Sequence, residues 1–530
     1  MSAPKDRAKL TERAGIVALG TLLSRILGLG RDLVVAACFP RIATDAFMVA
    51  FQIPNILRQL LAEGAVQNAV LPVLSATIET EGEDRGRAYF KNIRGLSLTI
   101  LLIVTALGMW FSPEIVLLFA PGFADRPEQF EQTVTLTRWV FPFIIFVGTT
   151  ALTSAALNVH QRFTASGFSP SLPNVAFILA ALLLPAWLIE IGQPPILSLA
   201  VGAVVGGALQ LFAQWPSLRA IGYAGFPSLR FSDPRVSETV RRMAPTLIGI
   251  GVYYLDVILG RRILSELGEG AVTYFGFALR LCDFPQGIFV MALQTATLPS
   301  LAALAARGQH EELSETFGFS VRLSLFVGLG AGALLVGMAE PLVRLLFERG
   351  EFGQVATTET ARALAAQGAG VMLVAIVRQL TSVYFSLGDT RTPVIVASVD
   401  LVVFVVSAMV LSRQFGHVGV SAAVTCASFA QMLLLWLLLG RRLPLPTHSV
   451  LRSGARMIPG AALTLGLGLL VSAFLRELPR GQANLGAAVS AMVLGVLYLG
   501  AARLFRCPEW TELSEPIKRR LTRKRASGHS

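Results

Sequence analysis

The first apolar stretch of the chain, residues 14–38, reads AGIVALGTLLSRILGLGRDLVVAAC and decides the class of fold. It follows a basic segment that contains Lys5, Arg7, Lys9 and Arg13. The run is too long for the apolar core of a cleaved signal peptide, and it lacks a small-residue cleavage site. About 20 apolar residues are enough to span the hydrocarbon core of a bilayer. We therefore predict that this stretch is the first transmembrane helix.

The rest of the chain repeats this pattern. Of 530 residues, 54% are hydrophobic and only 15% are charged, and the mean hydropathy is +0.63, which excludes a soluble protein. The sequence predicts an all-α polytopic membrane protein with about fourteen transmembrane helices. Their expected ranges are 14–38, 44–73, 95–120, 135–158, 168–192, 196–218, 241–264, 271–304, 318–339, 360–386, 393–412, 416–440, 455–476 and 483–505.

The net charge of +12 follows the membrane topology and not a nucleic-acid surface. Basic residues gather in alternate connections, such as 78–94, 219–242 and 441–456, as the positive-inside rule requires of cytoplasmic loops. The basic N-terminal segment and the basic tail 518–525 then lie on the same side. We predict that both termini are cytoplasmic and that the number of crossings is even.

The sequence contains an internal repeat. The segment around Pro113 resembles the segment around Pro341, 228 residues later. The prolines of the pairs Pro72 and Pro299, and Pro170 and Pro393, stand 227 and 223 residues apart. Near-equal offsets indicate one duplication. The predicted parts are an N-terminal six-helix lobe (1–225), a second six-helix lobe (226–445), two extra helices (446–510) and a basic tail (511–530).

Six is an even number, so the two lobes are predicted to be parallel repeats, related by an axis along the membrane normal. Duplicated lobes of this kind are typical of alternating-access transporters, which hold their substrate between the lobes.

Four arginines fall inside the predicted spans, namely Arg25, Arg31, Arg58 and Arg280. A charge at the centre of the bilayer costs roughly 2.5 kcal/mol or more, so these side chains must face protein or water. A guanidinium group binds phosphate oxygens in a bidentate manner and stays charged in any protein environment. We predict that the four arginines line a cavity that accepts an anionic, phosphate-bearing substrate. A kink at Gly28 and Gly30 is a hypothesis for how Arg25 and Arg31 reach one cavity.

The same residues have a structural interpretation. Four acids in or near these spans are candidate salt-bridge partners that hold helices together: Asp32, Asp45, Glu63 and Asp283. Arg378, in the tenth predicted helix, is a candidate either for the cavity wall or for helix packing. Asp256 and Asp400, with Thr425 as an oxygen ligand, form a candidate site for Na⁺ or H⁺ as the coupling ion, or they neutralise nearby arginines.

Several strings together resemble the MurJ (MviN) family of bacterial lipid II flippases over nearly the whole chain. They are Ser24-Arg25 through Arg31-Asp32, Thr44-Asp45-Ala46-Phe47, Pro54-Asn55 through Arg58 with Ala62-Glu63-Gly64-Ala65, Ala120-Pro121-Gly122-Phe123, and Phe284-Pro285 with Leu298-Pro299-Ser300.

The resemblance implies a MOP-superfamily transporter of the bacterial cytoplasmic (inner) membrane. It would move lipid II, the undecaprenyl-diphosphate-linked peptidoglycan precursor, from the inner to the outer leaflet by alternating access. The resemblance implies no enzymatic activity, no cofactor and a monomer among membrane lipids. The family's cavity arginines match Arg25, Arg31, Arg58 and Arg280, and its acidic partners match Asp32, Asp45 and Glu63. The two extra helices would form a groove for the lipid tail. The sequence departs from the family at Leu279, where an acid is common, and at Arg378, where lysine is common; Asp283 is a candidate to compensate for the first.

Other functions fit the sequence less well. A MOP-type exporter of another lipid-linked oligosaccharide would share the arginines, whereas an exporter of cationic drugs would favour acids in its cavity. A membrane transferase needs acid–base residues near a membrane face. The five histidines show no such pairing, no Walker-type loop is present, and the four cysteines lie far apart without metal-ligand spacing.

Overall fold

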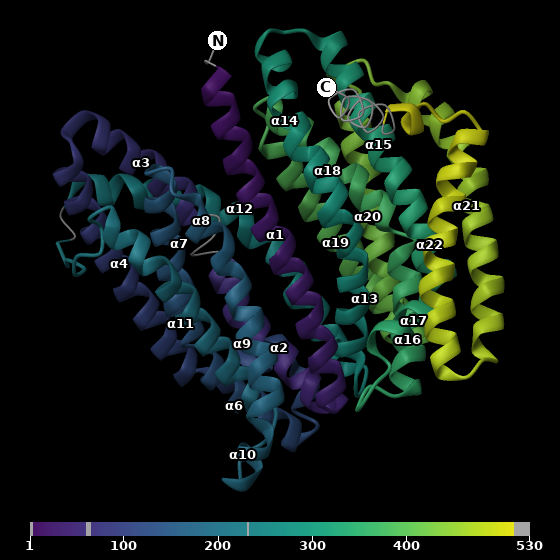
Figure 1. The fold of residues 1–530 in the computed structure, drawn as a ribbon, viewed down its shortest axis with the longest axis horizontal. Helices are drawn as coiled ribbons and strands as arrows, with labels where there is room; N and C mark the ends of the chain where they lie inside the picture. Colours follow the sequence, from purple (N-terminus) through teal and green to yellow (C-terminus); the bar gives the residue numbers. More distant parts are fainter. Residues whose placement is uncertain (1–3, 60–64, 231–232, 513–530) are drawn as a thin grey trace, which may run out of the picture. The chain divides into compact units, whose positions relative to one another are not determined.

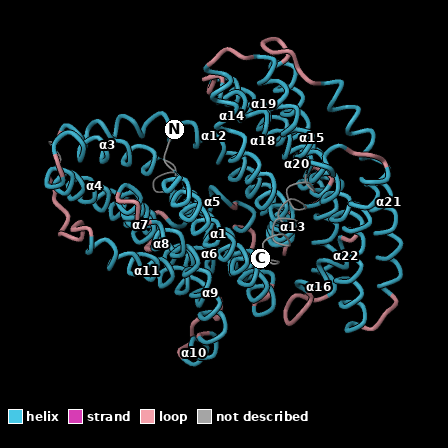
Figure 2. Tube along the Cα trace, turned by 45° about the horizontal axis from the view of Figure 1, so that its top comes forward, coloured by secondary structure: helices cyan, strands magenta, loops and turns pink. Residues whose placement is uncertain are grey.

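The structure is a computed structural model that describes residues 4–59, 65–230 and 233–512, with side chains left undescribed at 4–18, 65–68 and 244–253. Within these residues every regular element is a helix, as Figure 2 shows by colour. The all-helical class predicted from the apolar runs is therefore confirmed. The basic tail 518–525 and Glu63 lie outside the described residues.

The chain divides into two compact units by packing. The first unit comprises Met1–Val272 together with the short segment Arg349–Phe352. Its helices are α1 (Pro4–Cys38), α2 (Arg41–Arg58), α3 (Ala65–Glu81), α4 (Glu83–Trp110), α5 (Ser112–Phe119), η2 (Pro121–Phe123), α6 (Pro127–Val140), α7 (Phe143–Val159), α8 (Phe163–Phe168), η3 (Ser169–Ser171), α9 (Leu172–Leu183), α10 (Pro185–Glu190), α11 (Leu197–Ala220) and α12 (Pro234–Glu266) (Figure 1).

The second unit comprises Thr273–Glu348 and Gly353–Ser530. Its helices are α13 (Ala271–Pro285), the π-helix η4 (Gln286–Val290), α14 (Met291–Ala306), α15 (His310–Gly337), α16 (Ala339–Phe347), α17 (Gln354–Gly368), α18 (Val371–Ser386), α19 (Arg391–Phe415), α20 (His417–Leu439), α21 (Thr447–Arg476) and α22 (Arg480–Leu504) (Figure 1). The predicted lobe boundary at 225/226 refers to the sequence repeat and stays a prediction.

Each unit has its own apolar core. In the first unit α1, α2, α9 and α11 bury residues such as Phe47, Phe177 and Leu199 against one another. In the second unit α15 packs against α18 and α21, with Phe317 and Tyr384 fully buried. Removing this apolar surface from the surroundings and packing it closely stabilises each helix bundle.

The helix order in the two halves follows the predicted repeat. The 28-residue helices α4 and α15 are each followed by a short helix, α5 or α16, that carries Pro113 or Pro341. Pro72 and Pro299 both lie inside the helix that precedes the long one. The last two helices, α21 and α22, pack on α15 and α16.

Several predicted spans are interrupted. Of the predicted helix 44–73, the structure describes α2, which reaches Arg58, and α3, which begins at Ala65, while residues 60–64 lie outside the described residues. The predicted helix 271–304 contains the π-helix η4 directly after Pro285, and proline removes a backbone hydrogen bond inside a helix. The predicted helix 360–386 is bent by 43° between α17 and α18. Hydropathy identifies an apolar segment but does not detect such breaks.

Ten helices in the described part of the chain are long and apolar enough to span a membrane, or eleven if the bent pair α17 and α18 is one span. The ten do not include α1, α2, α3 or α12. A polytopic membrane protein is therefore confirmed, and the count of fourteen crossings stays a prediction.

Within the first unit, the C-terminal end of helix α12 packs on η2. The hydroxyl of Ser265 accepts a hydrogen bond from the backbone N–H of Gly122 in η2, at 3.2 Å, and the Ser265 carbonyl accepts one from Nη2 of Arg126, at 2.8 Å. A Cβ atom at position 122 would lie 2.4 Å from the Ser265 carbonyl oxygen. The close approach requires glycine at this position.

Candidate functional site

Arg31 is the best defined of the predicted cavity arginines. Its Nη2 and Nε atoms donate to Oδ1 of Asp32 at 2.7 and 3.0 Å. Both side chains are largely buried, with 16% of Arg31 and 12% of Asp32 exposed. The predicted pairing of Arg31 with Asp32 is therefore present, and it leaves the Nη1 face of the guanidinium for other contacts.

A second helix holds the remaining face of Arg31. Nη1 donates to Oδ1 of Asn174 at 3.2 Å, and the guanidinium lies 5.4 Å from the ring centre of Phe177. Both residues belong to α9. The amide nitrogen of Asn174 in turn donates to the carbonyl oxygen of Ser24 at 3.1 Å, so one asparagine joins two points of α1. Arg31 is thus oriented by α9 as well as by its neighbour in α1.

Arg25 and Arg58 lie in the same unit as Arg31, and both are half-buried. Helix α1 is continuous from Pro4 to Cys38, through Gly28 and Gly30. Residues six apart on a regular helix point about 120° away from each other. Arg25 and Arg31 therefore start from different faces of α1. Arg58 ends α2, and its Nε donates to Oδ1 of Asn55 at 3.0 Å.

Asp45 has an internal structural contact. Its side chain is fully buried, and Oδ2 accepts a hydrogen bond from the backbone N–H of Gly270 at 2.7 Å. The contact ties α2 to the loop after α12. A charged acceptor satisfies a buried N–H that would otherwise cost about 1–3 kcal/mol.

The remaining predicted site residues lie in the second unit. Arg280 is exposed on α13, and Asp283 is half-buried three residues later on the same helix surface. Arg378 is half-buried on α18, and its Nε atom is buried without a hydrogen-bond partner among the described residues. The predicted residues thus form two groups, one in each unit, and Glu63 lies outside the described residues.

Both groups place guanidinium charges within or beside apolar stretches of helix. Such charges are costly in hydrocarbon unless they face water, protein or an anionic ligand. Their fork geometry suits phosphate oxygens.

Comparison with known proteins identifies the family. Residues 34–483 match the family described as lipid II flippase MurJ. The lipid II flippase MurJ of Burkholderia cenocepacia is 33% identical over 451 residues, which are 84% of this chain and 86% of that protein. The probable lipid II flippase MurJ of Bdellovibrio bacteriovorus is 32% identical over 513 residues, 95% of this chain and 96% of that protein.

The chain belongs to the lipid II flippase MurJ family. Members of this family are transporters and not enzymes. The family match begins at residue 34, after Arg25 and Arg31, whereas the Bdellovibrio relative covers 95% of the chain.

Solved structures agree on the fold. A structure described as lipid II flippase MurJ in an inward closed conformation superposes with a TM-score of 0.76 at 20% identity, covering 92% of this chain and 98% of that one. An inward-facing multidrug resistance MATE transporter of the MOP superfamily gives 0.65 at 15% identity, covering 79% and 94%. The MurJ family fold is therefore shared in part with MATE transporters.

The predicted cation site is divided between the units. Asp256 lies on α12 of the first unit, whereas Asp400 on α19 and Thr425 on α20 belong to the second. The Thr425 hydroxyl donates to the carbonyl oxygen of Ala366 at 2.9 Å. Over the described residues, no group of three or more His, Cys, Asp or Glu side chains is arranged to hold a metal ion. A site for a coupling ion stays a prediction.

Asn174 and Phe177 were not among the residues predicted from the sequence. Both follow Pro173 in an apolar helix, where a single asparagine does not by itself indicate a functional site. The available signal was the cost of burying an amide in a membrane helix, which implies a polar partner on a neighbouring helix.

Proposed function

We propose that this chain carries lipid II from the inner to the outer leaflet of the bacterial cytoplasmic membrane. The proposal is supported by membership of the MurJ family along most of the chain and by the intramembrane arginines. The observation that carries it is Arg31, whose charge is largely buried in an apolar helix and oriented by Asp32 and Asn174.

The mechanism follows from the charge of the substrate. A diphosphate headgroup that crosses hydrocarbon unaided must lose its water at a large cost. In the proposal, Arg25, Arg31, Arg58 and Arg280 replace that water with fixed guanidinium groups, and Arg378 belongs to the same cavity wall. Alternating exposure of these groups to the two leaflets then moves the headgroup while the lipid tail stays in the membrane.

The remaining features of the transport cycle belong to the same proposal. Both termini lie in the cytoplasm, as the basic loops favour. The protein acts as a monomer. An inside-negative potential, or Na⁺ or H⁺ bound near Asp256, Asp400 and Thr425, drives the return step. If flipping continues unchanged after both the membrane potential and the sodium gradient are collapsed, neither of them drives the return step.

The test is complementation of a bacterial strain depleted of its own lipid II flippase. We expect wild type to restore growth, and we expect Arg25→Ala, Arg31→Ala, Arg58→Ala and Arg280→Ala to fail at equal membrane expression. Arg219→Ala is a matched control, because Arg219 is an exposed arginine at the end of α11 in the same unit as Arg31. The control is expected to grow like wild type.

Two results would contradict the proposal. A well-expressed wild type that does not restore growth would indicate another lipid-linked oligosaccharide as the substrate. Full growth of all four arginine variants would show that the arginines serve helix packing and not substrate binding.

A further inference from the structure

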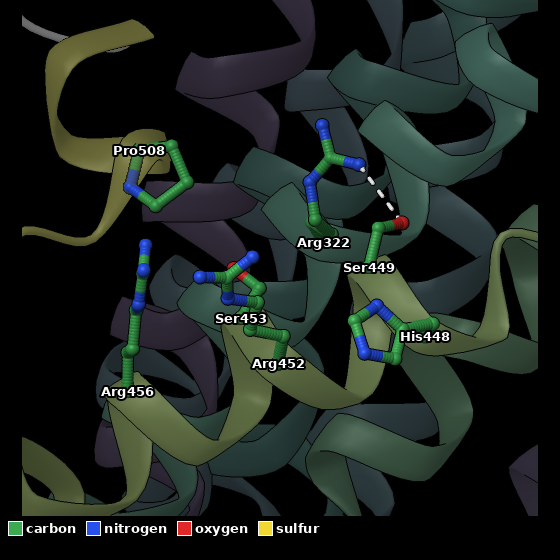
Figure 3. Close-up of a pocket in the computed structure, with 7 residues that line it drawn as sticks. All are labelled: Arg322, His448, Ser449, Arg452, Ser453, Arg456 and Pro508. Atoms are coloured by element: carbon green, nitrogen blue, oxygen red, sulfur yellow. Dashed lines mark hydrogen bonds between the residues drawn. The ribbon is translucent and has the colours of Figure 1, made fainter.

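A basic pocket lies in the second unit, where the first turns of α21 meet α15. The cavity has a volume of about 290 Å³. Figure 3 shows Arg452 and Arg456 from α21 and Arg322 from α15 around it, with Pro508 on another side. We call it the α21 pocket. None of its residues belongs to the proposed transport site.

The cations of the α21 pocket follow from helix periodicity. His448, Arg452 and Arg456 are spaced four residues apart, so they lie along one face of α21. Ser449 and Ser453 occupy the adjacent positions of the same face. This arrangement gathers donor groups over two turns of helix.

Only part of this positive charge is neutralised inside the protein. Glu509, which is fully buried, forms an ion pair with Nε of Arg322 at 3.2 Å and accepts a hydrogen bond from the Ser453 hydroxyl at 2.5 Å. Arg456 donates to the carbonyl oxygen of Arg506 at 3.4 Å, which is a neutral acceptor.

The charge of Arg452 is not neutralised by an acidic side chain among the described residues. Its side chain is exposed and makes no hydrogen bond or ion pair within the part of the chain that the structure describes. The acid Glu512, which is not part of the pocket lining, interacts electrostatically with Arg322. The pocket therefore has an excess of positive charge at Arg452 and Arg456.

The helix start strengthens the preference for an anion. The pocket contains the first turn of α21, whose N-terminal backbone N–H groups have no side-chain cap. Free N–H groups and the helix dipole favour negative charge at this end. Guanidinium forks add the geometry that fits phosphate oxygens.

The surroundings of the pocket point to a lipid. Next to it along α21, the apolar side chains of Leu451 and Ile458 are 67% and 57% exposed. The pocket opens at the end of the unit that carries the connection 440–446 with Arg441 and Arg442, the side that the positive-inside rule assigns to the cytoplasm. Basic pockets between helices at that surface suit anionic headgroups.

We propose that the α21 pocket binds the phosphate group of an anionic phospholipid of the inner leaflet. Arg452 and Arg456 contact the phosphate, and the acyl chains lie along the exposed apolar side of α21. The site is separate from substrate transport, and its ligand stays bound as a structural lipid.

The test is native mass spectrometry of the purified full-length chain, titrated with phosphatidylglycerol. We expect the double variant Arg452→Ala/Arg456→Ala to raise the Kd of the tightest bound lipid about ten-fold or more. The control Arg391→Ala/Arg441→Ala removes two exposed arginines from the same end of the unit, outside the pocket. It is expected to change the Kd less than about two-fold.

Further arms identify the ligand and control for folding. Phosphatidylcholine should bind weakly to wild type, because its headgroup has no net charge. Inorganic phosphate should not displace the lipid, and displacement at equal concentration would show that the pocket takes free phosphate instead. An unchanged Kd in a folded double variant overturns the proposal. If the double variant does not fold, we expect the single variant Arg452→Gln to bind the lipid more weakly. An unchanged Kd in that single variant also overturns the proposal.

Discussion

Arg31 depends on Asn174 for its orientation as much as on Asp32. Arg31 and Asp32 are neighbours in α1, so their ion pair alone does not fix the Arg31 guanidinium relative to other helices. The hydrogen bond from Nη1 to Asn174 fixes it to α9. A substrate phosphate would meet an arginine that is already aligned, which lowers the entropy cost of binding.

We predict that Asn174→Ala weakens transport without removing any charge. Hydrogen bonds to charged groups contribute about 1.5–3 kcal/mol, so the variant should bind lipid II about ten-fold or more weakly. The measurements are complementation and lipid II binding by native mass spectrometry. Ser24→Ala is the control, because Ser24 contacts Asn174 but not Arg31. Wild-type binding by Asn174→Ala would show that Asn174 does not position Arg31.

At the scale of elements, the contact between η2 and the end of α12 leaves no space for a side chain at Gly122. We predict that Gly122→Ala destabilises the protein by about 1–3 kcal/mol, because the new methyl group forces the two segments apart. The measurement is the melting temperature in detergent. Gly495→Ala is the control, because nothing lies within 4 Å of a Cβ at that position of α22. An equal effect of the two substitutions would contradict the prediction.

The elements also show what the sequence could and could not predict. Apolar runs and the Pro113 and Pro341 repeat predicted the helices and their order, because hydropathy reports contact with lipid directly. The break between α17 and α18 and the π-helix after Pro285 depend on local backbone bonding, which a hydropathy average does not detect. The partners of Arg31 were missed for a related reason, since they come from a helix 143 residues away in sequence.

The loop between α18 and α19 makes stability depend on pH. Asp389 accepts hydrogen bonds from the hydroxyl and the backbone N–H of Thr392 and from Arg442, and these lower its pKa to about 2. A lowered pKa means that the ionised carboxylate stabilises the folded state. This contribution is complete above the unfolded pKa of about 4 and disappears as the pH falls toward about 2.

We therefore predict that Asp389→Asn lowers the melting temperature at pH 7 and that the gap to wild type narrows as the pH falls below about 4. Thermal unfolding in detergent from pH 7 down to about 3 measures this gap. Asp84→Asn is the control, because the Asp84 carboxyl is 99% exposed. A gap that stays constant over the whole range would mean that Asp389 does not stabilise the fold through its charge.

At the scale of the whole molecule, the topology links the arginines to the proposed transport. If the chain crosses the membrane fourteen times, the connection at Asp84 and the connection at Arg441 face the cytoplasm, whereas Gln193 and Gln482 face the opposite side. Each compact unit thus offers one exposed position at either end. Asp84 and Gln193 form the pair in the first unit, and Arg441 and Gln482 form the pair in the second. If the number of crossings between the two members of a pair is wrong, one member faces the other side of the membrane. The two pairs therefore test the two units independently.

We predict that a membrane-impermeant thiol reagent, added to intact cells without their outer membrane, labels Gln193→Cys and Gln482→Cys but not Asp84→Cys or Arg441→Cys. The background chain carries Cys38→Ser and Cys426→Ser, because these two native cysteines are exposed and Cys282 and Cys507 are buried. Labelling of all four positions after cell lysis controls for reactivity. Labelling of Asp84→Cys and Arg441→Cys but not of Gln193→Cys or Gln482→Cys would place the basic loops outside the cell. In the proposed function the headgroup enters from the cytoplasm, so this result would contradict the proposed direction of transport.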